Sequence, residues 1–321
     1  MKRMIIVLLA GILFALGIGQ GFAQDYPSRQ IEIIIPFPPG GALDTVFRIF
    51  QSPLAAALGV PIFLTTKGGA AGALGTDYVA KAKPDGYTLL AGTSSSLLVA
   101  VAVNAAITYR YQDFTPIHLL ASDPILICSL PEAPWKNLDE LVDHARKNPG
   151  KLSYGSTGMG TTSFFTMELF KLSYGLDIVP VHFQGSGPVK TAILGGHVNL
   201  CSTTFGPMAS LVKSGKITPL VTSALERIPD YPEIPTLVER GFADASMNMW
   251  MGLFAPAKCP RTVVEKLVGA TAKAIKDPSI AAQLRKTEVL SDYRTGEETL
   301  KLIEKDWKMI NQVVQKLGIG K

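Results

Sequence analysis

Short apolar runs alternate with amphipathic segments along most of the chain. The apolar runs are bounded by Gly, Pro or polar residues, as β-strands are, and cover residues 31–37, 61–66, 87–92, 124–130, 151–156, 177–183, 198–204, 217–223 and 251–257. Patterns with the helical period lie between them at residues 43–58, 75–83, 138–148, 163–173, 187–196 and 207–215. This alternation predicts an α/β fold with mainly parallel sheets flanked by helices.

Two features modify this alternation. After Pro260 the apolar positions follow the helical period, which predicts amphipathic helices over residues 263–276, 278–287 and 298–318 with few strands between them. Pro53 lies inside the first helical pattern, where it removes a backbone hydrogen bond. We therefore expect a kink or a break at that point.

The first residues have the pattern of an export signal. Lys2 and Arg3 precede an apolar run over residues 4–18, and Gly21 and Ala23 supply the small residues that signal peptidase reads. We expect residues 1–23 to be removed by cleavage after Ala23, which predicts an exported protein. The run is short for a membrane anchor, which needs about 20 residues, and no later stretch approaches a span. The mature protein is therefore not expected to be embedded in a membrane.

Composition limits the remaining possibilities. Removing 23 of the 321 residues leaves 298, enough for two domains, and loss of Lys2 and Arg3 lowers the formal charge from +5 to +3. That weak excess, without a basic run interleaved with aromatics, argues against nucleic acid as a partner. Cys128, Cys201 and Cys259 are too few for a disulfide framework. One bridge is the most they allow, and packing of free thiols in the core is the alternative.

A glycine-rich turn follows the first predicted strand. Residues 38–42 connect this strand to the next helix, and Gly40 and Gly41 can turn where a side chain would clash. The first N–H groups of that helix lack internal partners and lie at the positive end of the helix dipole, so they suit an anion. Asp44, in the first turn, can accept bonds from these amides and shape the loop. A turn with an ordinary cap is the alternative interpretation.

The same construction recurs in the second half of the chain. A strand over residues 151–156 leads into a loop of glycines and hydroxyls and then into a helix. The loop residues of interest are Ser156, Thr157, Gly158, Gly160, Thr161 and Thr162. If the two halves are domains around a cleft, both loops face that cleft, and the ligand between them would be anionic.

Nucleotide binding and catalysis lack their usual sequence signals. The second loop runs G-x-x-G-x-G instead of G-x-G-x-x-G, and the first lacks the lysine of a P-loop. No serine occupies a G-x-S-x-G elbow, and the four histidines show no metal-binding spacing. We therefore expect no catalytic residue, no metal and no cofactor. Only His182, beside the turn at Gln184, is expected near a ligand.

Six stretches occur in order from Tyr26 to the C-terminus: PSRQIEIIIPFPPGGALD, KGGAAGALGTDYVAKAKPDGYTLLAGT, YQDFTPI, NPGKLSYGSTGMGTTSF, LGGHVNL and W-x-GLFAP. In content and spacing they resemble the extracytoplasmic solute-binding receptors of tripartite tricarboxylate transporters, the Bug or TctC family. The resemblance implies a two-lobed periplasmic binding protein, type II-like, with its ligand in the cleft between the lobes. We expect residues 24–123 and 250–321 in the first lobe and residues 124–249 in the second.

The resemblance also implies a function and a site. Receptors of this family hold a small organic carboxylate with backbone amides and bridging waters, and deliver it to membrane permease subunits without any chemistry of their own. Together with the loops above, the expected ligand-binding residues are Pro39, Gly40, Gly41, Ala42, Asp44, Thr93, Ser94, Ser95, Ser156, Thr157, Gly158, Gly160, Thr161, Thr162, His182, Gln184 and Thr204.

Two departures from the family pattern bear on the ligand. Phe183-Gln184-Gly185 stands where many members have Tyr-Lys-Gly or Tyr-Arg-Gly, and residues 202–205 lack the aspartate that many members carry there. A ligand ammonium would lose a partner, which favours an acid without an amino group, either a dicarboxylate or an aromatic acid. A sensor that presents its closed form to a membrane kinase is an alternative function, and a periplasmic enzyme is another.

Overall fold

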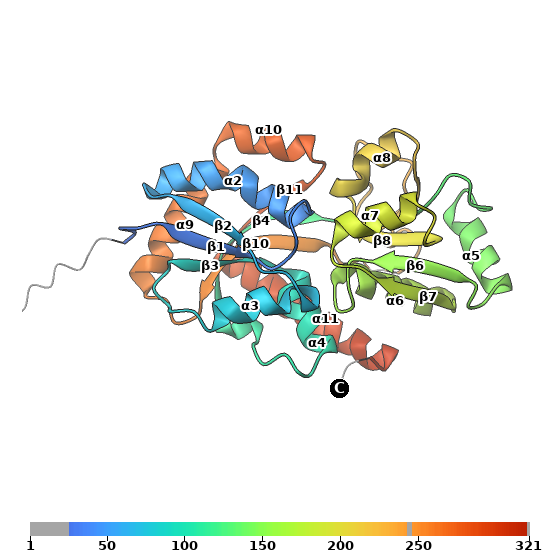
Figure 1. Cartoon of the computed structure of the whole chain (residues 1–321), viewed down its shortest axis with the longest axis horizontal. Coiled ribbons are helices and arrows are strands. Elements are labelled where there is room, and N and C mark those ends of the chain that lie inside the picture. The colour runs from blue at the N-terminus through green and yellow to red at the C-terminus, as the bar shows by residue number, and fades with distance from the viewer. Residues whose placement is uncertain (1–25, 243–245, 320–321) are drawn as a thin grey trace, which may run out of the picture.

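The computed structural model describes residues 26–242 and 246–319 and shows two lobes side by side (Figure 1). The predicted signal peptide and its cleavage point lie outside the described residues. The strands are β1 Ile31–Ile35, β2 Ile62–Thr66, β3 Thr88–Thr93, β4 Phe114–Asp123, β5 Ile125–Ser129, β6 Leu152–Ser156, β7 Ile178–His182, β8 Leu200–Thr204, β9 Thr218–Thr222, β10 Met249–Pro256 and β11 Leu290–Thr295. The α-helices are α2 Ala42–Leu58, α3 Ala73–Ala80, α4 Ala100–Val103, α5 Leu138–Lys147, α6 Thr162–Tyr174, α7 Ser186–Leu194, α8 Ala209–Lys213, α9 Arg261–Ile275, α10 Pro278–Lys286 and α11 Gly296–Leu317.

The first lobe is built on a sheet with the described strand order β11-β4-β10-β3-β1-β2. Helices α2 and α10 lie on one side of it, and α3 and α11 lie on the other (Figure 1). The central strand β1 is an almost unbroken apolar run, with Ile31, Ile33, Ile34 and Ile35 buried. Such a run is what a strand covered by helices on both faces requires.

The second lobe repeats this arrangement with the strand order β7-β6-β8-β5-β9. In each sheet three strands run parallel, β2-β1-β3 or β7-β6-β8, and the strand that enters from the other lobe pairs antiparallel with the third. The two-lobed α/β architecture is confirmed. The sheets are mixed instead of mainly parallel, because β10 and β5 each enter against the direction of the three parallel strands.

Two strands and one helix differ from the sequence prediction. The patterns did not indicate β4, which contains Pro116 and pairs with β10 through two register shifts, or β11, an edge strand of mostly exposed polar residues. Of the kink or break expected at Pro53, the break is wrong, because α2 continues from Ala42 to Leu58, and the kink stays a prediction. Its buried stripe, which includes Phe47, Phe50 and Leu54, packs on both sides of the proline and holds the helix together.

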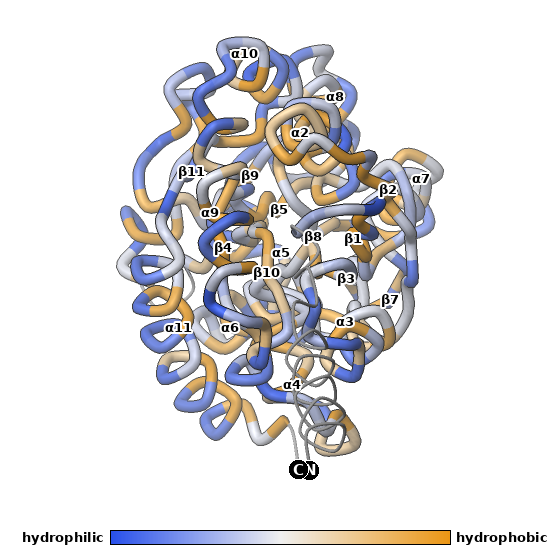
Figure 2. Tube along the Cα trace, turned by 90° about the vertical axis from the view of Figure 1, so that its left-hand side faces the viewer, coloured by the Kyte–Doolittle hydropathy of each residue, from blue (hydrophilic) through white to orange (hydrophobic). Residues whose placement is uncertain are grey.

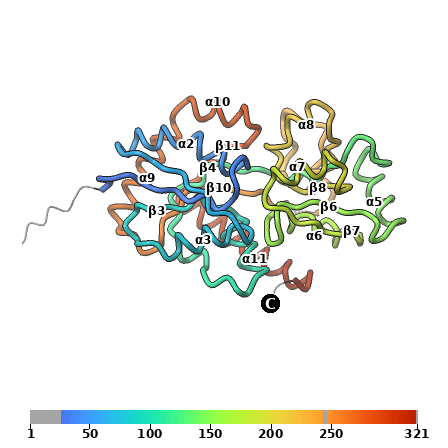
Figure 3. Tube along the Cα trace, in the orientation of Figure 1, coloured from blue at the N-terminus to red at the C-terminus, as the bar shows by residue number. Residues whose placement is uncertain are grey.

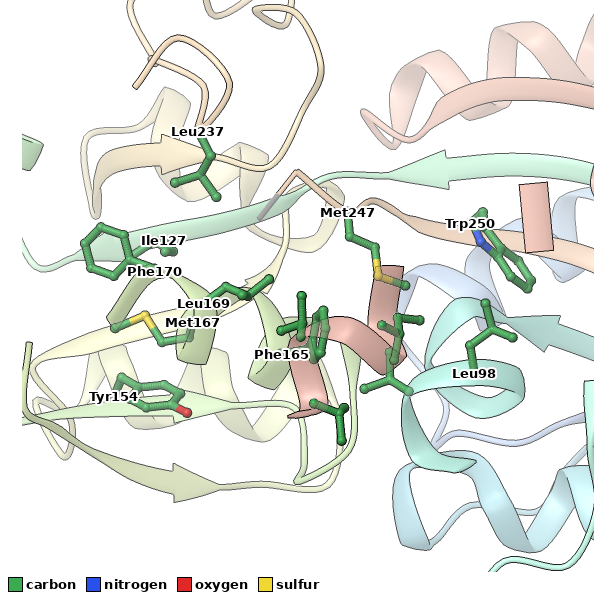
Figure 4. Packing of buried hydrophobic residues seen from close by; sticks show 14 of the residues in the cluster. Leu98, Ile127, Tyr154, Phe165, Met167, Leu169, Phe170, Leu237, Met247 and Trp250 are labelled. Atoms are coloured by element: carbon green, nitrogen blue, oxygen red, sulfur yellow. The ribbon is translucent and has the colours of Figure 1, made fainter. Parts of the chain in front are cut away.

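Buried side chains form a core that continues from one lobe into the other. In Figure 4, Phe165 of α6 and Trp250 of β10 lie in one cluster, with Met247 between them. Helix α11 supplies Ile303 and Ile310 to the same cluster. Hydrophilic and hydrophobic stretches alternate along α11 in Figure 2, as expected for a helix with one face on the protein.

The backbone links the lobes through two neighbouring segments of the described chain (Figure 3). The first passes directly from β4 to β5 at Pro124, and the second leads into β10 at Met249. Ser223, which is fully buried, joins the two: its hydroxyl accepts from the Ile125 N–H at 2.8 Å and donates to the Met247 carbonyl at 3.1 Å. All strands of the first sheet lie outside residues 124–248, and all strands of the second lie within them. The predicted lobe limits stay a prediction.

A buried carboxyl lies at the first of these segments. Asp123, at the end of β4, is fully buried, and its Oδ1 accepts from the N–H of Gly206 in the second lobe at 3.0 Å. Burial raises the pKa of Asp123 to about 7, against the opposing effect of the bonds that its carboxylate accepts. The carboxyl therefore changes charge near neutral pH at the point where the lobes join.

We predict that Asp123→Asn changes the pH dependence of stability. Because the folded-state pKa lies above the ordinary value of 3.8, the native state holds a proton that the unfolded state has released between about pH 4 and pH 7. The free energy of unfolding should therefore fall across that window by up to about 1.4 kcal/mol per pH unit in the wild type, and the variant should lack this component. Urea denaturation of both proteins at pH 5 and pH 8 measures it. Parallel pH profiles would contradict the buried proton.

Three hydroxyls join the lobes beside these segments. Ser94 and Ser95 lie directly after β3. The Oγ of Ser94 is 3.0 Å, and the Oγ of Ser95 2.9 Å, from the Oγ1 of Thr162 at the start of α6. Ser95 Oγ also accepts from the Thr162 N–H at 2.9 Å. All three side chains are buried, so each bond replaces one that water would otherwise supply.

Replacing Ser95 with Ala should destabilise the protein. The substitution leaves the buried N–H of Thr162 without its acceptor, at a cost of roughly 1–3 kcal/mol in the free energy of unfolding. Ser214→Ala, at an exposed serine, is the matched control. If urea denaturation gave both variants the same stability, the bond between the lobes would have no energetic role.

Candidate ligand-binding site between the lobes

Two adjoining cavities lie between the lobes, one of about 440 Å³ and one of about 50 Å³. Residues from both lobes line each of them. The shared wall consists of Phe37 and Pro38 from the first lobe and Thr157, Gln184 and Gly185 from the second. One molecule could therefore occupy both cavities at once and touch both lobes.

The smaller cavity borders the N-terminal ends of two helices, one from each lobe. Helix α2 begins after Gly41 and α7 after Gly185, and no described side chain caps either helix. In α2 the first intrahelical bond runs from the Thr45 N–H to the Gly41 carbonyl, so the preceding amides have no partner within the helix. The positive ends of both helix dipoles thus meet at one small cavity. This geometry suits an anion.

Asp44 shapes the first loop as the sequence predicts. Its Oδ2 accepts from the Gly40 N–H at 3.0 Å and from the Arg48 Nε at 2.9 Å. Its Oδ1 is buried and has no hydrogen-bond partner among the described residues. Asp44 lines the smaller cavity, so this oxygen is available to a water or a donor group there.

Thr204 supplies a second unused polar atom to the smaller cavity. Its Oγ1 is buried and has no described hydrogen-bond partner within 3.5 Å. The Thr204 hydroxyl is also near the Asp123 carboxyl, where it acts to lower the pKa of Asp123. Buried polar atoms are nearly always satisfied by protein or by ordered water. The hydroxyls and amides at this cavity can therefore serve a bound molecule.

The second predicted loop is largely closed by the protein's own hydroxyls. The Thr157 N–H donates to Ser163 Oγ at 3.1 Å, and the Thr162 N–H donates to Ser95 Oγ. Thr161 Oγ1 caps α6 by accepting from the Phe164 N–H. The N-terminus of α6 is thus capped from within, and the helix that faces α2 across the smaller cavity is α7.

The larger cavity is mainly apolar. Its walls are Phe37, Pro38, Gly69, Ala70, Ala71, Gly72, Ala100, Val103, Asn104, Ile107, Thr157, Gly158, Met159, Gly160, His182, Phe183, Gln184 and Gly185. None of these described lining residues is Lys, Arg, Asp or Glu. His182 Nδ1 lies 2.8 Å from Ser156 Oγ, and burial lowers the pKa of His182 below 6.5, so the ring is neutral at pH 7.

The structure places 11 of the 17 predicted residues at the cavities. The smaller cavity is lined by Pro39, Gly41, Ala42, Asp44, Ser95 and Thr204, the larger by Gly158, Gly160 and His182, and both by Thr157 and Gln184. The six that line neither cavity are Gly40, Thr93, Ser94, Ser156, Thr161 and Thr162. These six make hydrogen bonds within the protein. Their role in ligand binding stays a prediction.

Sequence reasoning missed residues 186–188 at the start of α7, which line the smaller cavity, and two wall segments of the larger cavity. One is the run Gly69–Gly72, where Ala70 and Ala71 have positive φ values of 49° and 55°, a conformation rare for residues with side chains. A run of six small residues, 68–73, after a predicted strand was the available signal. The other runs from Ala100 to Ile107, whose apolar side chains could not be told from ordinary core positions.

Within the described ranges, no helix is long and apolar enough to cross a membrane. A similar chain of known sequence is a UPF0065 protein from the tcbD-tcbE intergenic region of Pseudomonas sp. strain P51, which is 32% identical over 282 residues and is matched over 86% of this chain and 84% of its own.

Two solved structures share the fold. R. palustris Rpa4515 with adipate is 27% identical, with a TM-score of 0.86 over 92% of this chain and 99% of that one. MatC from Rhodopseudomonas palustris with bound malate is 30% identical, with a TM-score of 0.84 over 90% of this chain and 100% of that one.

The family model described as "Tripartite tricarboxylate transporter family receptor", TctC, matches residues 46–319. This match covers most of the chain and agrees with the motifs and the two-lobed fold. The protein is therefore a member of the TctC family of tripartite tricarboxylate transporter receptors.

Proposed function

We propose that this protein binds a small organic carboxylate between its lobes in the periplasm and delivers it to the membrane permease subunits of a tripartite tricarboxylate transporter. The observation that carries this proposal is the meeting of two uncapped helix N-termini, one from each lobe, at one small cavity. The family membership and the carboxylates bound by the two similar structures support it.

Main-chain amides suit a receptor because they recognise a carboxylate without being consumed. A hydrogen bond to a charged group contributes roughly 1.5–3 kcal/mol. Only the closed arrangement brings α2 and α7 to the same anion, so a carboxylate binds this arrangement better than an open one. That difference in affinity is what allows the solute to bias the lobes toward closure.

The first prediction of this function is stabilisation by acids. Purified mature protein, beginning at residue 24, should show a raised melting temperature with at least one member of a panel of organic carboxylates, because a ligand of the native state raises apparent stability. The methyl ester of the same acid should have no effect, since it lacks the anion. If no acid raised the melting temperature more than its methyl ester did, the result would contradict the proposal. Uptake of the bound acid into vesicles that carry the permease should require the receptor.

Gly41→Val should abolish binding and leave the fold intact. Gly41 has a φ of −85°, a Cβ atom added there meets no described protein atom within 4 Å, and the residue lines the smaller cavity. The valine therefore fills space that the carboxylate needs. We expect an affinity loss of at least about 100-fold by calorimetry, or roughly 2.8 kcal/mol. Gly269→Val, which also points into open space but on α9, should bind normally. Equal affinity in the two variants would refute the site.

A further inference from the structure

We infer that the ligand is a monocarboxylate with an apolar or aromatic body, held with its carboxylate in the smaller cavity and its body in the larger. This inference rests on the proposed function and specifies its ligand. It follows from the sizes of the two cavities, from their shared wall and from the charges around them.

The sizes divide the ligand into a head and a body. The smaller cavity of about 50 Å³ exceeds the roughly 10–15 Å³ that one water needs by the same measure, and so admits a group of carboxylate size. The larger cavity of about 440 Å³ falls in the range of about 300–1,000 Å³ typical of small-molecule sites. Because Phe37, Thr157 and Gln184 line both, the head and the body can belong to one molecule.

The charges argue against a second carboxylate on the body. None of the described residues that line either cavity is Lys or Arg. Helix α3 also begins at the larger cavity, after Gly72, and lacks a described side-chain cap, but its Ala73 and Leu74 N–H groups donate to the carbonyls of Ala70 and Gly69 in the preceding turn. A second carboxylate would lie against Val103, Ile107 and Met159 without a cation. Burying an unpaired charge among apolar groups is unfavourable. Burial of an ammonium group on the body would also be unfavourable, because no described residue that lines the larger cavity is acidic.

Neutral polar groups on the body would be accepted. Asn104, His182 and Gln184 line the larger cavity, and each can donate or accept a hydrogen bond without carrying charge at pH 7. A hydroxyl or carbonyl substituent therefore has partners there. The similar structures hold adipate and malate, which are dicarboxylates, so this chain differs in the body that it selects.

Matched acid pairs test this selectivity. Calorimetry should compare benzoate with terephthalate and hexanoate with adipate, each pair differing by one carboxylate. We expect the monocarboxylate of at least one pair to bind ten or more times tighter than its partner. Equal or tighter binding of both dicarboxylates would overturn the inference and leave the proposed function intact. If none of the four acids and no member of the wider panel bound, both would be overturned.

Adding a cation to the larger cavity supplies a second test. Met159 lines that cavity and is 66% exposed, so Met159→Lys adds charge without disturbing the core. Leu225 is 67% exposed and lines neither cavity, so Leu225→Lys is the matched control. The affinity for terephthalate relative to benzoate should rise at least tenfold in Met159→Lys and stay unchanged in the control. An unchanged ratio in both variants would overturn the inference.

An independent observation concerns two cysteines in the second sheet. Cys128 of β5 and Cys201 of β8 stand directly opposite one another in the antiparallel register, and both are fully buried. Their Sγ atoms lie 2.7 Å apart. Unbonded carbon atoms rest about 3.5–4.0 Å apart, whereas the sulfurs of a disulfide are about 2.05 Å apart. We infer that these two thiols form a disulfide in the exported protein.

The bond would form by exchange with another disulfide. The two thiols lose two protons and two electrons and gain one S–S bond, while the disulfide of a thiol–disulfide oxidoreductase accepts the electrons and becomes a dithiol. Burial raises the pKa of Cys128 in the folded protein, so exchange belongs to the folding chain, before the sheet closes. The bridge ties β5 to β8 within one lobe and so leaves movement between the lobes free.

Thiol counting tests the bridge. The protein purified from the periplasm should be denatured without reductant, treated with N-ethylmaleimide and weighed by mass spectrometry. We expect one adduct, on Cys259, and three after reduction. Three adducts without reduction would overturn the inference. In Cys201→Ser two adducts are expected without reduction, on Cys128 and Cys259, which verifies that the reagent reaches Cys128.

Discussion

The site depends on one constraint: the first amides of every helix need an acceptor from outside the helix. Helix α6 satisfies this need with Thr161 and with Ser95 from the other lobe, so its end is closed. Helices α2 and α7 have no such cap among the described residues, and both border the smaller cavity. The difference between capped and uncapped ends decides where an anion can bind, more than the number of glycines in each loop does.

The strand topology brings the two uncapped ends together. In each lobe the parallel strands end at the side that faces the other lobe, and the loops that follow them begin the helices there. The polypeptide links between the lobes run beside the same region, where Ser223 bonds to both of them. The lobes are therefore joined next to the cavities, and a small rotation at the links changes the separation of α2 and α7.

Much of this could be predicted from residue patterns. Nine of the strands follow from short apolar runs, and the first loop with Asp44 follows from glycine geometry and the rules of helix ends. The patterns failed where the deciding contact is remote in sequence. The N–H of Thr162 donates to Ser95, 67 positions earlier, a contact that the residues around Thr162 did not indicate. Likewise Gly69–Gly72 and Val103 became cavity walls only through tertiary packing, which local periodicity does not encode.

The bonds between Ser94, Ser95 and Thr162 require no solute. They form a latch of protein atoms alone, so an empty receptor can rest with its lobes together. A transporter that recognised only the overall closed shape would then bind empty receptors as readily as loaded ones, and its rate of solute transport would fall. Under the proposed function, docking would instead depend on a local difference at the mouth of the cavities, where an occupied site alters the exposed surface of the two loops that contain Met159 and Gln184.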